Sequence, residues 1–277
     1  MTENNELSKN YMRSAWKIML EQDLFSSLEI LRKEMRYHGL EKVKPTLVAR
    51  FGKIRSPGSP SVSLENLQKN HVNETCLRHS KRSFYSKVPS SYMKNIVDEV
   101  VQKIGIDFEG EKDIYHVKVE LNQVCQMIAD ISYPDKNLDL RLMLCSKRIL
   151  TADLTDAEII SIKELVSSAV LDSDVKGGLR WPVGKTSSRD RFSVVGVWHT
   201  VTRAYSSPSL RLIVRHADRY DFRTGFGEAG KEVHMKLKGI VSEFMEQGAQ
   251  NDSVSDMLKD SLKLIWDNFL CCEPFLT

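Results

Sequence analysis

The chain has 277 residues, of which 41% are hydrophobic, and a formal net charge of +3 at pH 7. This content suffices for one large core or two smaller ones. The sequence has no run of about 18 apolar residues and starts with the polar stretch MTENNELSK, so we expect neither a membrane span nor a secretory signal.

Positive charge is concentrated near the N-terminus. Residues 1–90 hold 16 Lys and Arg against 9 Asp and Glu, a net of +7, which leaves −4 for the remainder. Such asymmetry favours a polyanion-binding N-terminal part, although a solvated basic face is the simpler alternative.

Residues 6–21 are expected to form a helix with apolar positions on more than one side, including Tyr11, Met12 and Trp16. Arg13 and Lys17 continue a basic row along it. An apolar surface this broad on a short helix predicts a partner, and we expect a homodimer.

A second helix is predicted to begin at Asp23. Its apolar seam has the i, i+4, i+7, i+11 spacing, and basic residues occupy the other side. The seam is formed by Leu24, Leu28, Leu31 and Met35, and the basic residues are Arg32, Lys33 and Arg36. We therefore expect a small all-helical domain over residues 1–80 that dimerises through positions such as Leu28 and Leu31.

Residues 43–61 are predicted to be a loop, because Pro45, Pro57, Gly58 and Pro60 interrupt regular structure. Residues 81–87 belong to a basic linker. The next segment, 88–200, is expected to open with a helix from Ser90 or Ser91.

Further elements predict an α+β domain. Alternating patterns predict strands at YHVKVELNQV, NLDLRLML, RFSVVGVWHTV and SLRLIVR, with a helix at 157–171 between the second and third of them. Residues 201–277 form an extension expected to close with two amphipathic helices, one through Val233 and Phe244 and one through Val254 and Phe269.

The stretch GGLRWPVGKTSS, residues 177–188, superficially resembles a phosphate-binding loop. That loop follows a strand and has four residues between its first glycine and the Gly-Lys pair. Here five residues separate Gly178 from Gly184. A nucleotide hydrolase using Gly184, Lys185 and Thr186 is therefore the less favoured function. We identify no catalytic residue, metal site or cofactor.

Several short segments occur in the order and near the spacing of a known family. They are Trp16, LRKEMR at 31–36, VPSSY at 88–92, VELNQ at 119–123, GGLRW at 177–181 and Trp198. Together they resemble influenza virus non-structural protein 1, the viral interferon antagonist, and suggest a divergent member from an influenza-like orthomyxovirus.

The resemblance implies roles for particular residues. Arg32, Lys33 and Arg36 would contact double-stranded RNA, and we assign Arg13 and Lys17 to the same surface. Lys33 stands where the family usually has Arg, which replaces a bidentate contact by a point charge. Contacts with host proteins are expected at Pro89, Tyr92, Gly178 and Trp181.

The function that follows is a non-enzymatic viral regulator. It would bind double-stranded RNA and host innate-immunity and mRNA-processing proteins, as a homodimer in the host nucleus and cytoplasm, and suppress the interferon response. The alternatives are a host-protein adaptor without RNA binding and the hydrolase above. Residues 201–277 receive no function.

Overall fold

The computed structural model describes most strands and helices of the chain. The described residues are 20–36, 43–55, 83–119, 125–131, 138–148, 194–221, 226–247 and 252–270, with short pieces between residues 156 and 180.

One large antiparallel sheet dominates the described structure. Its strand order is β3-β8-β9-β10-β1-β5-β4, and β2 pairs with β1. The bounds are β1 Val43–Arg55, β2 Ser83–Tyr85, β3 Asp107–Val119, β4 Cys125–Ile131, β5 Asp139–Arg148, β8 Val194–Ser206, β9 Leu210–Asp221 and β10 Phe226–Leu237. A separate small sheet pairs β6 Val170–Leu171 with β7 Leu179–Arg180.

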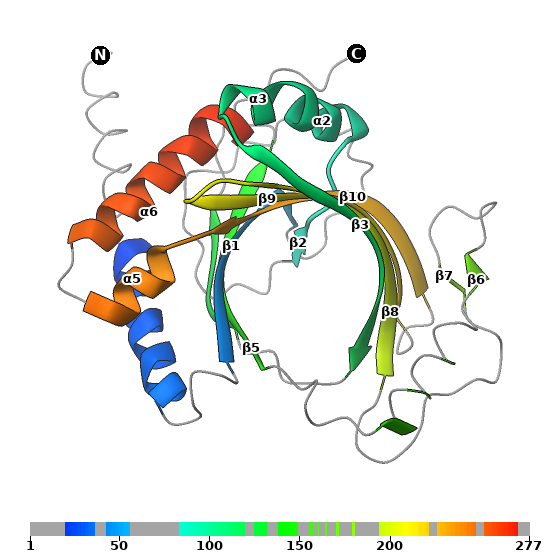
Figure 1. Ribbon diagram of the computed structural model, residues 1–277, viewed down its shortest axis with the longest axis horizontal. Coiled ribbons are helices and arrows are strands. Elements are labelled where there is room, and N and C mark those ends of the chain that lie inside the picture. Colours follow the sequence, from blue (N-terminus) through cyan, green and yellow to red (C-terminus); the bar gives the residue numbers. More distant parts are fainter. Residues whose placement is uncertain are drawn as a thin grey trace.

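The sheet curves strongly, and the helices lie outside the curve. In Figure 1, β1 and β5 stand on one side of an opening and β3 and β8 on the other. Outside are a helix over 20–36, α2 Ser90–Asn95, the π-helix η2 Ile96–Val100, α3 Val101–Lys103, α5 Ile240–Gln247, α6 Asp252–Ile265 and the π-helix η3 Trp266–Leu270. The sheet therefore has a convex face that meets helices and a concave face that borders the opening.

Alternation along the strands separates these two faces. On β1 the side chains of Leu47, Ala49 and Phe51 are fully buried. Phe51 stacks on Phe269 with ring centroids 5.2 Å apart, which places this set against the C-terminal helices. The residues between them, such as Arg50, therefore lie on the concave face.

The core joins distant parts of the chain. The helix over 20–36 contributes its predicted apolar seam, and Phe25 stacks on Phe244 of α5 at 5.8 Å. From α2, the hydroxyl of Tyr92 donates a hydrogen bond to the backbone oxygen of Phe269 at 3.0 Å. Elements from both ends of the described chain thus pack into a single cluster.

The predicted fold class is wrong. The protein is mostly an antiparallel eight-stranded sheet with few helices, and its N-terminal part is no separate all-helical domain. The helix expected within residues 24–35 exists, but its seam packs into this chain's own core.

Several local predictions succeeded and others failed, among them the linker expected at 81–87, which contains strand β2. The loop expected at 43–61 contains the central strand β1 up to Arg55, and the helix expected through Val233 is strand β10 up to Leu237. The strands that include β5, β8 and β9, the helix starting at Ser90 and the last helix are confirmed. Within the described part of the chain, no helix has the length and apolar character to cross a membrane.

Candidate anion-binding site

The concave face gathers charged side chains from neighbouring strands. Residues directly opposite one another in adjacent strands share a face of the sheet. The register pairs Arg50 with His234, Glu232 with Arg215, and Arg219 with both Glu228 and Trp198. Side chains from β1, β8, β9 and β10 therefore converge on the same face.

Glu232 is the centre of this arrangement. Its side chain is only 4% exposed and accepts bonds from two guanidinium groups. Arg215 donates a hydrogen bond from Nε to Oε2 at 2.7 Å, and its Nη2 lies 2.6 Å from the same oxygen as an ion pair. Arg219 donates to Oε1. The hydroxyl of Ser86 donates to the same Oε1 at 3.0 Å. Both carboxylate oxygens are thus engaged.

The charges around Glu232 determine its protonation. Burial alone would raise the pKa of the Glu232 carboxyl, but the guanidinium groups of Arg215 and Arg219 outweigh it and hold that pKa at about 2. Glu232 is therefore negative at neutral pH.

Arg50 and His234 complete the buried cluster. Burial lowers the pKa of the Arg50 guanidinium; Glu232 opposes this shift, while Arg215 and Arg219 add to it. Arginine nevertheless stays protonated in proteins. Burial also lowers the pKa of the His234 imidazole well below 6.5, and the charges of Arg215 and Arg50 lower it further, so His234 is neutral at pH 7.

Positive charge exceeds negative charge in this cluster. Three guanidinium groups face one carboxylate, which gives a net charge of +2. Within the described residues, no carboxylate is close enough to form an ion pair with Arg50. A partly desolvated excess of arginine is the kind of environment that binds phosphate groups.

The short strand β2 crosses one end of the concave face. A side chain at Gly52 would meet the backbone oxygen of Tyr85 at 2.1 Å, so only glycine allows this approach. Phe84 lies under the guanidinium of Arg141, 4.7 Å from its carbon to the ring centroid. The segment from Phe84 to Ser86 therefore bounds the cluster on the β5 side.

Most other acidic groups of the concave face are already paired. Asp130 accepts two bonds from Arg141, at 2.6 and 2.7 Å. Asp139 accepts one from the backbone of Ile54 at 2.8 Å, and Glu228 pairs with Lys87 at 2.6 Å. No group of three or more His, Cys, Asp or Glu in the described part of the chain is placed to hold a metal ion.

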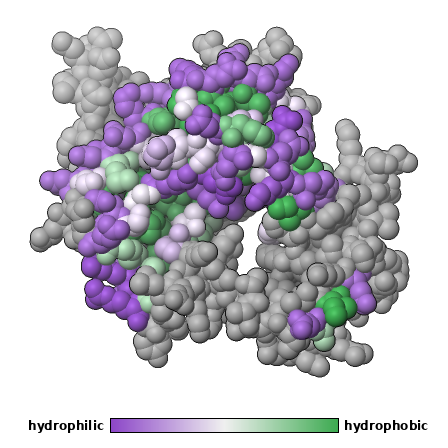
Figure 2. All heavy atoms as spheres, viewed as in Figure 1, coloured by the Kyte–Doolittle hydropathy of each residue, from purple (hydrophilic) through white to green (hydrophobic). Residues whose placement is uncertain are grey.

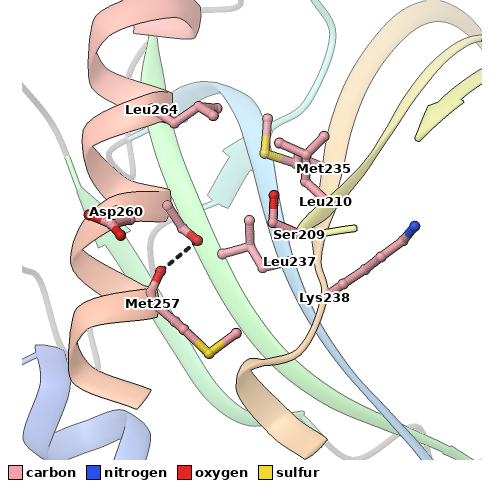
Figure 3. Close-up of a pocket in the computed structure, with 9 residues that line it drawn as sticks. Ser209, Leu210, Met235, Leu237, Lys238, Met257, Asp260 and Leu264 are labelled. Carbon is pink, nitrogen blue, oxygen red and sulfur yellow. Dashed lines mark hydrogen bonds between the residues drawn. The ribbon is translucent and has the colours of Figure 1, made fainter. Parts of the chain in front are cut away.

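A small cavity lies on the opposite face of the sheet, against α6 (Figure 3). It encloses about 160 Å³ between Leu210, Met235, Met257 and Leu264 among others. Its Ser261 hydroxyl bonds the backbone oxygen of Met257 at 2.8 Å, and Lys238 bonds Ser206 and Ser207. Ligand pockets usually exceed about 300 Å³. The concave face is therefore the better candidate.

The residues predicted as sites do not meet in one place. Tyr11, Met12, Arg13, Trp16, Lys17, Gly178 and Trp181 lie outside the described residues, as do Gly184, Lys185 and Thr186. Leu28 and Leu31 are fully buried in this chain's own core, and Arg32 lies 3.7 Å from Glu29 along the same helix. Lys33 and Arg36 belong to that helix too.

Pro89 and Tyr92 lie at the start of α2. Pro89 is its N-cap residue, and Tyr92 is 1% exposed. Because the Tyr92 hydroxyl is bound inside the core, this residue has a role in packing.

The arginines of the cluster were missed by the sequence reasoning. SLRLIVR was predicted as a strand, and it ends at Arg215. Arg211, Arg215 and Arg219 repeat every four residues, a spacing that places them on one face of the longer strand β9. That even spacing was the available indication. The sequence offered no such indication for Arg50, because its segment was predicted to be a loop.

A strongly curved antiparallel sheet with helices outside and a charged concave face defines a tunnel-like fold. The RNA triphosphatase Pct1 of S. pombe has a similar structure, with a TM-score of 0.52 at 10% identity, over 89% of this chain and 93% of that one. Pct1 in complex with the Spt5 CTD gives a TM-score of 0.47 at 12% identity, over 87% and 91%. The chain therefore shares the fold of Pct1.

The chain belongs to the family described as Domain of unknown function (DUF7903), whose model matches residues 1–119 and 117–269. No curated protein matches the sequence.

These findings correct the expected identity and function. The resemblance to influenza non-structural protein 1 is wrong, and so is the viral regulator inferred from it, because the fold is shared with an RNA triphosphatase. The expectation of a non-enzyme is contradicted as well, since a fold shared with a hydrolase makes an enzyme possible. The homodimer and the cellular location stay predictions.

Proposed function

We propose that the concave face binds the phosphate groups of a triphosphate, on a nucleotide or at the 5′ end of an RNA. The observation that carries this proposal is the convergence of Arg50, Arg215 and Arg219 around one carboxylate, with a net charge of +2. A triphosphate is compact and highly charged, so it gains most from several guanidinium groups that already lie close together.

The location of the cluster supports this ligand class. In the space-filling view an open hollow interrupts the molecule where Figure 1 shows the opening of the sheet (Figure 2). Trp198 lies under Arg219, 5.5 Å from its guanidinium carbon to the ring centroid, which fixes the orientation of that group. The likeness to an RNA triphosphatase adds that this fold can accommodate a triphosphate in another protein.

Calorimetric titration of the full chain tests the proposal. Inorganic triphosphate, orthophosphate, ATP and a short RNA with a 5′ triphosphate are compared. We expect triphosphate to bind more tightly than orthophosphate, and its affinity to fall as salt rises. The differences in affinity between ATP, the RNA and inorganic triphosphate then show whether the site prefers a nucleotide, an RNA end or the free triphosphate. Orthophosphate release is followed in the same samples.

A matched pair of variants locates the binding. Arg50→Met removes a positive charge from the cluster. Arg203→Met removes one from the convex face, because Arg203 lies opposite the buried Val214 of β9, and it pairs with Glu111 at 2.8 Å. We expect the first substitution to weaken triphosphate binding and the second to leave it unchanged. Equal losses, or no binding of any triphosphate by the wild type, would overturn the proposal.

A further inference from the structure

Divalent cations often accompany phosphate groups bound to proteins, so the concave face can be tested for a site that would hold one. A divalent cation such as Mg²⁺ or Mn²⁺ needs carboxylate oxygens with lone pairs free to point at it. Glu232 has the most central carboxylate, yet one oxygen accepts from Arg215 and the other from Arg219 and Ser86. The groups nearest to this carboxylate are cations.

The other concave-face carboxylates named above are engaged as well, and Glu228, on the same strand as Glu232, pairs with Lys87 at 2.6 Å. Asp130 is held by a bidentate pair with Arg141, at 2.6 and 2.7 Å. Asp139 faces the backbone N–H of Ile54 at 2.8 Å. Both belong to strands on the far side of β1 from Glu232. The described donor set therefore does not fit a metal ion.

Arginine supplies the charge that such a cation would bring. A divalent cation carries two positive charges, and the cluster of Arg50, Arg215 and Arg219 around Glu232 has the same net charge. To coordinate a cation, Glu232 would have to release two guanidinium groups, leaving them buried and unpaired beside the cation. Such an arrangement is strongly unfavourable, because the buried charges lose their partners.

We infer that this site takes a triphosphate directly on its arginines, without a divalent cation bridging ligand and protein. The inference rests on the proposed function and specifies the chemistry of the same site. Glu232 then acts as a positioning residue, which orients Arg215 and Arg219 and reduces the charge of the empty site.

The first test is calorimetric titration of inorganic triphosphate into the full chain, once in EDTA and once with excess Mn²⁺. We expect the affinity in EDTA to equal or exceed that in Mn²⁺, because Mn²⁺ neutralises part of the ligand's charge. Binding that requires Mn²⁺ would overturn the inference and leave the proposed function standing. No binding in either buffer would overturn both.

The second test is Glu232→Gln, which keeps a hydrogen-bond acceptor and removes the negative charge. If Glu232 only positions the arginines, the cluster rises from +2 to +3 and triphosphate binds about tenfold more tightly in EDTA. If Glu232 is a metal ligand, Mn²⁺-dependent binding is lost instead. Glu111→Gln removes a carboxylate paired with Arg203 on the convex face and should change neither titration.

Mn²⁺ added alone gives an independent readout, followed by the electron paramagnetic resonance signal of the free ion. We expect equal free Mn²⁺ with the wild type and with Glu232→Gln. Mn²⁺ bound by the wild type and released by the substitution would contradict the inference. If Glu232→Gln does not fold, the comparison of EDTA with Mn²⁺ on the wild type decides alone.

Discussion

The two faces of the same sheet pair arginine with carboxylate in different ways. On the convex face, Arg203 and Glu111 are 54% and 47% exposed and form a one-to-one pair at 2.8 Å. On the concave face, Glu232 is 4% exposed and forms ion pairs with two arginines, Arg215 and Arg219, and Arg50 lies nearby. Water screens the first pair, whereas the second set keeps an excess of positive charge in a poorly screened place. Residue type alone thus does not identify a site; burial and stoichiometry do.

The largest effect is expected from removing the shared carboxylate. Glu232→Ala leaves Arg215 and Arg219 without their partner in a buried position, and breaking such a pair costs about 3–5 kcal/mol of unfolding free energy. Glu111→Ala on the convex face should be nearly neutral. Urea denaturation at pH 7 measures both, and similar losses would remove the proposed difference between the faces.

Arg50→Met should weaken triphosphate binding by about tenfold to a hundredfold, the usual worth of a hydrogen bond to a charged group. The variant should unfold no more easily than the wild type, because it removes a desolvated charge without an ion-paired partner among the described residues. Titration and denaturation on the same sample separate the two effects. A large stability loss would show that Arg50 supports folding.

The dependence of stability on pH should also differ between the faces. The pKa of His234 is depressed in the folded protein, so the unfolded chain binds a proton first as pH falls below about 6.5. Folding should therefore lose about 1–2 kcal/mol between pH 7 and pH 5. His234→Gln should reduce this loss without abolishing it, because burial also lowers the pKa of His216. Urea midpoints across this range provide the measurement.

A second, more acidic phase belongs to Glu232. Its folded pKa of about 2 lies below the ordinary value near 4.5, so its contribution is present above pH 4.5 and is lost as pH falls toward 2. In Glu232→Gln this phase should be missing while the His234 phase is still present. The same decline in both proteins would assign the acidic phase to other carboxylates.

Much of the local structure was predictable from the sequence. Alternation placed the strands that contain Leu142, Trp198 and Leu212, and helical spacing placed the seam of Leu24 and Leu28. These patterns succeed because one face of each element is buried and the other is polar. The spacing predicts that an apolar seam is buried, but it does not predict which element buries it. The seam of Leu24 and Leu28 packs into its own chain, where a dimer had been expected.

The central strand and the site depended on information that local patterns lack. Pro45 stands near the start of β1, where a missing N–H is tolerated, and Gly52 permits the close approach of Tyr85. In the sequence, Pro45 was interpreted as a loop signal, together with prolines beyond the end of β1. Because this segment was predicted as a loop, Arg50 could not be placed beside His234. Only the register of β1 with β10 brings these two residues together.

The central claim is that triphosphate lies on the arginine excess of the concave face. A crystal structure of the full chain with inorganic triphosphate, grown in EDTA, tests it most directly. The account predicts phosphate oxygens within hydrogen-bond distance of Arg50, Arg215 and Arg219, with Glu232 still bound to the last two. Triphosphate bound only to convex-face residues such as Arg203, or held through a cation on Glu232, would contradict it.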